Sequence, residues 1–303
     1  MSVFSKLVVS TTQARPVEKL VTGTKPGKAL ASRFVAGDHL DDAVRVAKRL
    51  NAEGFLVSLD LLGEEVRDRD TAVIARDEYL ECLERIAAEG MDANISIKLT
   101  QLGLNIDYRL ATDAVDLLAE AAGSVGTTVT IDMEDSDHTA ATVELYANAQ
   151  KAHGNLGLAL QAYLRRTPDD LARLVQLGGH LRLCKGAYVE PASIALRSKS
   201  EVDAAFAQQI RALMTSTGVL PAVATHDQAM IDLTRELAAA RDEPFEFQML
   251  FGVRSSLQKE LVGAGFPLRV YLPFGSQWYP YLTRRLAERP SNTWFFVRSV
   301  FGS

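Results

Sequence analysis

The chain has 303 residues, of which 47% are hydrophobic and 23% charged, and its formal net charge is −5. These values are ordinary for a soluble globular protein with a large core, and the length is natural for one (β/α)8 barrel. The negative balance and the lack of a broad basic stripe exclude a nucleic-acid-binding protein, but they are compatible with a local basic pocket for an anionic ligand.

Cysteine usage and hydropathy indicate a protein that stays inside the cell. Cys82 and Cys184 have neither metal-ligand spacing nor an obvious disulfide partner, so we expect a reducing, cytoplasmic environment. No apolar run is long enough for a transmembrane helix, and the first ten residues are too short for a secretory signal. A peripheral contact with the inner face of the cell membrane would leave little trace in the composition.

After an N-terminal helical region of about fifty residues, apolar strands alternate with amphipathic helices such as 203–214 and 228–241. This alternation predicts a parallel sheet, and eight strand–helix units predict its closure into a single (β/α)8 TIM-like barrel with an N-terminal helical extension. Residues 1–30 form an extension without an assigned role, and residues 31–303 form one domain. The expected strands are 54–60, 93–99, 128–134, 156–163, 180–186, 220–226, 245–250 and 268–273.

Polar residues gather in the carboxyl-terminal halves of these strands, although a strand buried on both faces should be almost entirely apolar. In a (β/α)8 barrel this end carries the active site. A single buried charge is explained by a core ion pair, but polar groups from five or more strands at one rim are hard to explain by packing. The residues are Lys98, Asp132, Glu134, Gln161, Arg182, Lys185, His226, Gln248 and Tyr271.

Several of these residues have more than one interpretation. Lys98 could be a Schiff-base nucleophile, a cation for a carboxylate, or the partner of Asp132. Asp132 and Glu134 point to the same side of the predicted strand, so at most one need face the centre. His226 could bind a metal, contact a cofactor or fill a polar core position, and because no second histidine lies nearby we expect no metal site. Tyr188 could cover a ligand or simply pack.

The segment 271–289 runs from an apolar strand through a glycine turn into a helix with two adjacent arginines, Arg284 and Arg285. Tyr281 lies one helical turn before the pair and Glu288 one turn after it. Two guanidinium groups form a strong clamp for a carboxylate. The alternative is a solvated helix face with ordinary ion pairs.

The pattern indicates a barrel enzyme with a small anionic substrate, and two chemistries remain open. No Gly-x-Gly-x-x-Gly follows a strand, so the usual dinucleotide motif is missing. One candidate is a lysine-dependent aldolase or lyase that uses Lys98 or Lys185. The other is a redox enzyme whose cofactor lies across the barrel mouth, held by Arg182, Gln161 and His226.

Several segments, read together and in order, resemble the monofunctional bacterial proline dehydrogenase family. The resemblance runs from about residue 30 to residue 300, and the segment 271–289 is the most specific part. The other segments are 34–37 (FVAG), 61–64 (LLGE), 95–100 (ISIKLT), 131–134 (IDME), 160–163 (LQAY), 182–188 (RLCKGAY), 224–227 (ATHD) and 246–250 (EFQML).

The resemblance implies a distorted (β/α)8 barrel that binds FAD at the carboxyl ends of its strands, with residues 31–303 as the FAD-binding domain. It implies oxidation of L-proline to Δ¹-pyrroline-5-carboxylate by hydride transfer to flavin N5, with a membrane quinone as electron acceptor. The chain is too short for a second, aldehyde-oxidising domain, so a separate pyrroline-5-carboxylate dehydrogenase would act next.

The resemblance also implies roles for individual residues at the substrate. Arg284 and Arg285 would hold the proline carboxylate with Lys98 as a third cation, while Asp132 and Tyr271 shape the site. Tyr281 would pack against the proline ring and crowd a ring hydroxyl, which favours proline over hydroxyproline. The implied substrate residues are Lys98, Arg284, Arg285, Tyr281, Leu250 and Glu64.

For the cofactor, the resemblance places Arg182 at the flavin N5, where a positive charge favours the reduced ring. Either Arg197 or Lys199 would reach the pyrophosphate. The implied cofactor residues are Asp132, Gln161, Arg182, Lys185, Ala187, Arg197, Thr225, His226 and Glu288.

Overall fold

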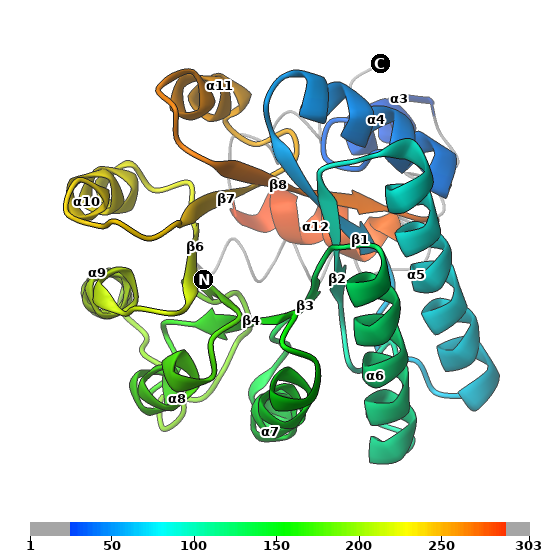
Figure 1. Cartoon of the computed structure of the whole chain (residues 1–303), viewed down its shortest axis with the longest axis horizontal. Coiled ribbons are helices and arrows are strands. Elements are labelled where there is room, and N and C mark those ends of the chain that lie inside the picture. The colour runs from blue at the N-terminus through cyan, green and yellow to red at the C-terminus, as the bar shows by residue number, and fades with distance from the viewer. Residues whose placement is uncertain (1–24, 289–303) are drawn as a thin grey trace.

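The strands of the protein close into one parallel barrel in the order of the sequence. The structure, a computed structural model, describes residues 25–288 of the chain. Within these residues, neighbouring strands pair in parallel from β1 to β8, and β8 returns to pair with β1. Helices follow the strands and surround the barrel (Figure 1). The predicted (β/α)8 barrel is confirmed.

The strands are β1 (Leu56–Leu61), β2 (Ala93–Ile97), β3 (Val129–Ile131), β4 (Leu156–Gln161), β5 (His180–Cys184), β6 (Leu220–Ala224), β7 (Glu246–Leu250) and β8 (Leu268–Phe274). The helices are α3 (Lys25–Ala31), α4 (Leu40–Ala52), α5 (Arg69–Glu89), α6 (Tyr108–Ser124), α7 (Ser136–His153), α8 (Thr167–Leu174), α9 (Lys199–Thr215), α10 (Gln228–Ala238), α11 (Ser255–Gly263) and α12 (Trp278–Glu288). A 3-10 helix, η1 (Val175–Leu177), follows α8. None of the helices between residues 25 and 288 is long and apolar enough to cross a membrane.

Strands β2 to β6 end two or three residues earlier than the sequence predicts, and past β2 and β3 side chains take part in the hydrogen bonding of the backbone. Beyond β2, the backbone N–H of Thr100 donates to a carboxylate oxygen of Glu134 at 3.0 Å. Beyond β3, the backbone oxygens of Met133 and Glu134 accept hydrogen bonds from Gln161 Nε2, both at 3.2 Å. Several predicted site residues therefore lie in the loops just past the strands, where the chain can turn them toward a ligand.

Two predicted helix boundaries also differ from the structure. Helix α9 begins at Lys199 rather than at residue 203, because Ser198 and Glu201 form a reciprocal capping box at its amino end. Helix α10 ends at Ala238 rather than at residue 241.

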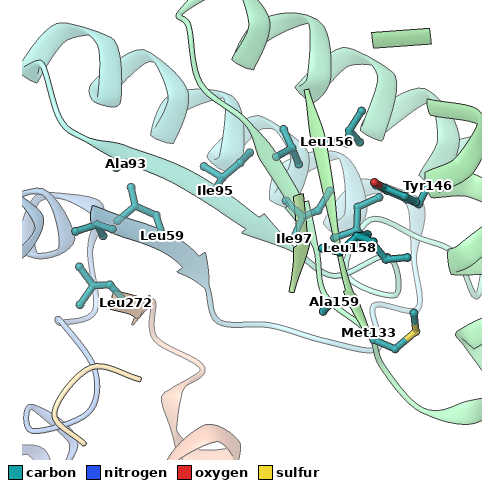
Figure 2. Packing of buried hydrophobic residues seen from close by; sticks show 14 of the residues in the cluster. Leu59, Ala93, Ile95, Ile97, Met133, Tyr146, Leu156, Leu158, Ala159 and Leu272 are labelled. Carbon is teal, nitrogen blue, oxygen red and sulfur yellow. The ribbon is translucent and has the colours of Figure 1, made fainter. Parts of the chain in front are cut away.

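The apolar core lies between the strands and the surrounding helices. Along β1, the core residues Val57 and Leu59 alternate with buried polar residues, so one row of side chains faces the helices and the other faces the barrel interior. Figure 2 shows part of the apolar layer, where Leu158 of β4 lies beside Tyr146 of α7. Burying each such side chain contributes about 1.5–3 kcal/mol, so this layer holds the helices on the barrel.

The amino-terminal half of the barrel interior is filled by hydrogen-bonded polar side chains. His180 Nε2 lies 2.6 Å from the hydroxyl of Thr130, which accepts a hydrogen bond from Asn94 Nδ2 at 3.1 Å. Arg269 donates to both carboxylate oxygens of Glu246, at 2.8 and 3.0 Å. Polar residues therefore line the amino-terminal half of the barrel as well as the carboxyl ends of the strands. The buried polar side chains of this half form hydrogen bonds with one another across the barrel interior.

His180 is buried in this layer and is held in its neutral form. Burial lowers its pKa from 6.5 to about 3, against the opposing effect of the Glu246 carboxylate. The neighbouring strand makes room for the imidazole at Gly157, where a Cβ atom would stand 2.0 Å from Nε2. Protonating His180 would therefore place a charge in a site built around a neutral ring.

Helix α12 crosses one end of the barrel and is fixed there by the chain that precedes α4 (Figure 1). Leu30 and Phe34 form a small apolar cluster with Leu62, Trp278 and Leu282. The predicted boundary at residue 30 falls inside α3, where Leu30 and Ala31 are buried. Residues 1–24 lie outside the described part of the chain.

We predict that His180 makes the protein acid-sensitive. Because the folded-state pKa is depressed, its stabilising contribution is complete above pH 6.5 and is lost as the pH falls toward the folded-state value of about 3. Between pH 7 and pH 5 this single group should cost about 2 kcal/mol of unfolding free energy. Urea unfolding should show a weaker pH dependence for His180→Gln than for the wild type.

The matched control for this prediction is Gln209→Leu, since Gln209 is a buried polar residue of α9, lies outside the barrel interior and has no titratable group. This variant should keep the wild-type pH dependence. If the unfolding free energy of the wild type and of His180→Gln depends on pH to the same extent, His180 is not the source of the acid sensitivity.

Candidate active site

A cavity of about 440 Å³ opens at the carboxyl ends of the strands. Its volume suits a small-molecule ligand or part of a larger cofactor. It is lined by residues from the ends of β4 to β8, from the loops that follow β2, β3, β5 and β6, and from α12. The structure brings these predicted site residues together: Lys98, Asp132, Gln161, Arg182, Lys185, Ala187, Thr225, His226, Leu250, Tyr271 and Arg285.

Arg182 and Asp132 form the charged centre of the cavity. Arg182 Nη1 donates to Asp132 Oδ1 and, at 3.0 Å, to the hydroxyl of Ser96. Tyr271 donates its phenolic hydrogen to Asp132 Oδ2 at 2.6 Å, and its ring lies 5.2 Å from the Arg182 guanidinium. Burial alone would raise the pKa of Asp132, but Arg182 and Lys98 together hold it below the usual value, so this carboxylate stays ionised.

Lys98 binds a carboxylate that the sequence analysis did not identify. Its Nζ makes a short contact with Asp60 Oδ1 at the end of β1, and lies 3.6 Å from Asp132 Oδ2. Burial by itself would lower the pKa of Lys98, but these two carboxylates raise it above its usual value, so the amine stays protonated. Lys98 is thus a partner of Asp132, as one interpretation held, but its nearer partner is Asp60. The sequence marks Asp60 only as a lone carboxylate at the carboxyl end of an apolar strand.

Asp132 and Glu134 have different partners, although the strand pattern placed them on one side. Because β3 ends at Ile131, the alternation of a strand no longer applies to them. Both line the cavity, but Glu134 is tied to Thr100, whose backbone N–H and hydroxyl donate to it at 3.0 and 2.5 Å. Burial raises the pKa of Glu134. Asp132 is therefore the carboxylate of the charged centre, and Glu134 holds the loop after β2.

The residues past β5 and β6 are tied to one another. Lys185 Nζ donates to Asp203 at 2.5 Å and to Asp227 at 2.7 Å. His226 Nε2 accepts a hydrogen bond from the backbone N–H of Leu250 at 3.1 Å, which links the loop after β6 to the end of β7. Lys185 therefore reaches the cavity as a largely neutralised cation.

The loop between β5 and α9 covers one side of the cavity with Tyr188. Its neighbour Glu190 accepts hydrogen bonds from the backbone N–H and the hydroxyl of Ser136, at 2.8 and 2.6 Å, and so caps the amino end of α7. Tyr188 thus lines the cavity, and its role in covering a ligand stays a prediction. Arg197 lies further along the loop, exposed and apart from the lining residues, and Lys199 pairs with Asp203.

Helix α12 brings Arg285 to the cavity. The Arg285 guanidinium lies 5.2 Å from the centre of the Tyr281 ring. Tyr281, Glu64 and Lys98 line a small adjoining hollow of about 20 Å³. The side chains of Arg284 and Glu288 lie outside the described part of the structure, so the second arginine of the predicted clamp remains a prediction.

The cavity wall contains buried polar atoms that suit a cofactor with both donor and acceptor groups. Among the described residues, Arg182 Nη2 is a buried donor and Gln161 Oε1 a buried acceptor, and neither has a hydrogen-bond partner. Such atoms are costly to bury unless a ligand or water satisfies them. A flavin ring, whose edge has acceptor nitrogens and oxygens and a donor N–H, fits this pair of groups.

A parallel barrel with a charged cavity at the carboxyl ends of its strands defines the class of (β/α)8 barrel enzymes. Within this class, the chain belongs to the proline dehydrogenase family, whose sequence profile matches residues 43–298.

Individual relatives agree with this assignment. The chain is 39% identical over 281 residues to proline dehydrogenase 1 of Bacillus subtilis subsp. natto, which covers 92% of both chains. It is 36% identical over 283 residues to the proline dehydrogenase of Deinococcus radiodurans, covering 89% of this chain and 90% of the relative. A solved structure of proline utilization A from Bdellovibrio bacteriovorus, inactivated by N-propargylglycine, has a similar fold. Its TM-score is 0.81 at 22% identity, over 91% of this chain and 34% of that chain.

We predict that Lys98 stabilises the folded protein by neutralising Asp60. Lys98→Met leaves the Asp60 carboxylate buried without its cation, and removing one partner of a buried pair costs about 3–5 kcal/mol. Urea unfolding should show this loss, and adding Asp60→Asn to the same protein should restore much of it.

Lys48→Met is the control for the Lys98 variant, because Lys48 forms a surface pair with Glu89 at 2.6 Å. Its loss should be below about 1 kcal/mol. If the two lysine variants lose the same stability, the buried pair does not have the proposed role.

Proposed function

We propose that the protein oxidises L-proline to Δ¹-pyrroline-5-carboxylate with FAD as cofactor and passes the electrons to a membrane quinone. The observation that carries the proposal is the convergence of three cationic side chains, Lys98, Arg182 and Arg285, on one cavity at the carboxyl end of the barrel. Membership of the proline dehydrogenase family supports the choice of proline among small carboxylates. The quinone, and a peripheral contact with the membrane that contains it, rest on the family resemblance.

Proline binds through its carboxylate in this proposal. Lys98 and Arg285 line the cavity as cations, and Arg284 is the expected second member of the arginine clamp. Fixing the carboxylate sets the position of the ring, and such orientation accounts for a large part of the rate. Leu250 offers an apolar surface to the ring carbons, and Tyr281 and Glu64 close the adjoining hollow.

The amine of proline must be neutral for the reaction, because a protonated nitrogen has no lone pair to form the C=N bond. A cluster of cations lowers the pKa of a bound ammonium group and so favours this form. The ring carbon next to the nitrogen loses a hydride, the nitrogen loses its remaining proton, and the imine forms. Asp132 and Tyr271 are the polar groups that shape this part of the cavity, and the family resemblance assigns them to the site.

FAD, when bound, supplies the acceptor for the hydride at N5. Of the residues assigned to it, Gln161, Lys185, Ala187, Thr225 and His226 line the cavity. Arg182 lines the same cavity and has a buried donor, Nη2, without a partner among the described residues, and its charge would favour a reduced, more electron-rich ring. Arg197, which is not among the residues that line the cavity, remains a prediction for the pyrophosphate, and Glu288 remains a predicted cofactor residue.

The alternative of a lysine-dependent aldolase has less support. A Schiff-base lysine must lose its proton, but carboxylate partners raise the pKa of both Lys98 and Lys185 despite their burial. Lys98 is held by Asp60 and Asp132, and Lys185 by Asp203 and Asp227. Both lysines are therefore poor nucleophiles in this arrangement.

The visible spectrum of the purified protein tests the proposed function. A flavin spectrum that bleaches when L-proline is added without oxygen is the expected result, since the two electrons remain on the cofactor. A flavin that proline does not reduce would reject the substrate, and a protein that takes up no FAD would reject the cofactor.

We also predict that Arg285→Met raises the proline KM steeply while the flavin content stays the same. Losing one cation from a desolvated contact costs about 2–5 kcal/mol, which corresponds to roughly tens- to thousands-fold in affinity. Steady-state kinetics and the ratio of flavin to protein absorbance measure the two quantities.

Arg173→Met is the matched control for Arg285→Met, because Arg173 pairs with Glu144 at the surface of the barrel, 2.6 Å away. It should leave the proline KM unchanged. An unchanged KM in Arg285→Met would remove Arg285 from the carboxylate clamp.

A further inference from the structure

The guanidinium group of Arg182 is fixed from two directions. Nη1 donates to Asp132 and Ser96 on one side, and Nε donates to Gln248 Oε1 at 2.5 Å on the other. Nη2 is buried and is the one nitrogen of this group without a partner among the described residues. Arg182 lines the cavity, and the two anchors therefore fix the orientation of its guanidinium there.

Gln248 can accept this hydrogen bond because Glu246 orients its amide. Gln248 Nε2 donates to Glu246 Oε1 at 2.6 Å. This hydrogen bond leaves the amide oxygen of Gln248 facing Arg182. A carboxylate can only accept, so the reversed amide would lose both hydrogen bonds. Glu246 is in turn held by Arg269 at 2.8 and 3.0 Å. Burial raises the pKa of Glu246, but Arg269 and Gln248 bring it below its usual value, so the acceptor stays ionised.

The chain leaves space for this connection across β6, which lies between β5 and β7. Ala222 is in register with Arg182 on one side and with Glu246 on the other. Ala224 is in register with Gln248. Because both β6 residues are alanines, Arg182 can reach Gln248 over them. Glu246 and Gln248 are 3% and 4% exposed, so water does not replace these contacts.

We propose that Glu246 and Gln248 are positioning residues that act through Arg182 to set the reduction potential of the bound flavin and the rate of proline oxidation. This inference rests on the proposed function, because it takes the flavin to be the group that Arg182 faces. Neither residue needs to touch the substrate. Their effect is to hold the positive charge and the Nη2 donor of Arg182 in one orientation.

Loss of the Gln248 oxygen leaves Arg182 Nε without its partner and allows the guanidinium to turn toward Asp132. A buried hydrogen bond to a charged group changes an equilibrium by about 10- to 100-fold. We therefore expect Gln248→Leu to lower kcat by about 10- to 100-fold and to change the proline KM much less, because the carboxylate clamp is intact. The flavin midpoint potential should become more negative, because a misaligned cation stabilises the reduced flavin less.

The midpoint potential is measured by titrating the flavoprotein with dithionite, without proline. Gln209→Leu is the matched control, because Gln209 is also 4% exposed but lies on α9 and donates to the backbone oxygen of Ala162 at 3.2 Å. This control should keep the wild-type potential and kcat. Equal potentials for Gln248→Leu and Gln209→Leu would overturn the proposal.

A double-mutant cycle tests whether the effect passes through Arg182. In an Arg182→Met protein, adding Gln248→Leu should produce no further shift of the potential. The same shift in both backgrounds would show that Gln248 acts by another route and would overturn the proposal. Glu246→Gln should shift the potential in the same direction as Gln248→Leu, and an unchanged potential would remove Glu246 from the inference.

Gln248→Met replaces Gln248→Leu in the same measurements if the leucine variant does not fold, because its side chain is as long but lacks the amide. The dithionite titration does not depend on the substrate. A wild-type flavin that proline leaves oxidised would therefore reject the proposed function, whereas the potentials of the variants decide the role of Gln248 separately.

Discussion

Charge buried inside a closed barrel has to be neutralised within the barrel, and this constraint explains the arrangement of the interior. An ion without a partner there would cost several kcal/mol, so each buried cation in the described structure lies beside a carboxylate. The pairs are Arg269–Glu246, Arg182–Asp132 and Lys98–Asp60. Gln248 joins the first pair to the second, and Tyr271 lies between the second and the third. The barrel thus contains one continuous polar network that ends at the cavity.

This arrangement separates the parts of the protein that provide stability from those that carry out chemistry. The apolar core lies outside the barrel, between strands and helices, so the interior need not supply hydrophobic contacts. Its amino-terminal half is filled by the polar layer around His180, and its carboxyl-terminal half opens into the cavity. The network fixes Arg182 and Lys98 before a ligand arrives. Such preorganised charges act on a bound substrate without the cost of reorienting them during the reaction.

Much of the fold and part of the site could be predicted from the sequence. The alternation of apolar strands and helices predicts the barrel, and polar residues near strand ends predict which side chains meet there. Pattern alone could not predict the pairing. No pattern in the sequence marks Asp60 as a site residue, because it is a single carboxylate at the end of an apolar strand and its partner Lys98 lies 38 residues away along the chain. The family resemblance assigns Arg197 to the cofactor, and in the structure this residue is exposed and is not among the residues that line the cavity.

The role of the deeper polar residues also depends on contacts that a sequence does not display. Arg182 and Gln248 are separated by 66 residues, and they meet because the register of β5, β6 and β7 places two alanines between them. A period of two along each strand identifies the inward-facing residues but does not say which of them touch across the barrel. The described structure shows these contacts, and they join the polar strand residues into one network that ends at the cavity.

The most direct test of this account is a crystal structure of the FAD-loaded protein with cyclopentanecarboxylate bound. This compound has the ring size and carboxylate of proline but no amine. We expect Arg182 to keep its hydrogen bonds to Gln248 and Asp132 and to donate from Nη2 to the flavin. The carboxylate should lie against Lys98 and Arg285. A guanidinium that has left Gln248 to reach the cofactor, or a carboxylate bound away from these cations, would contradict a site that the buried network forms in advance.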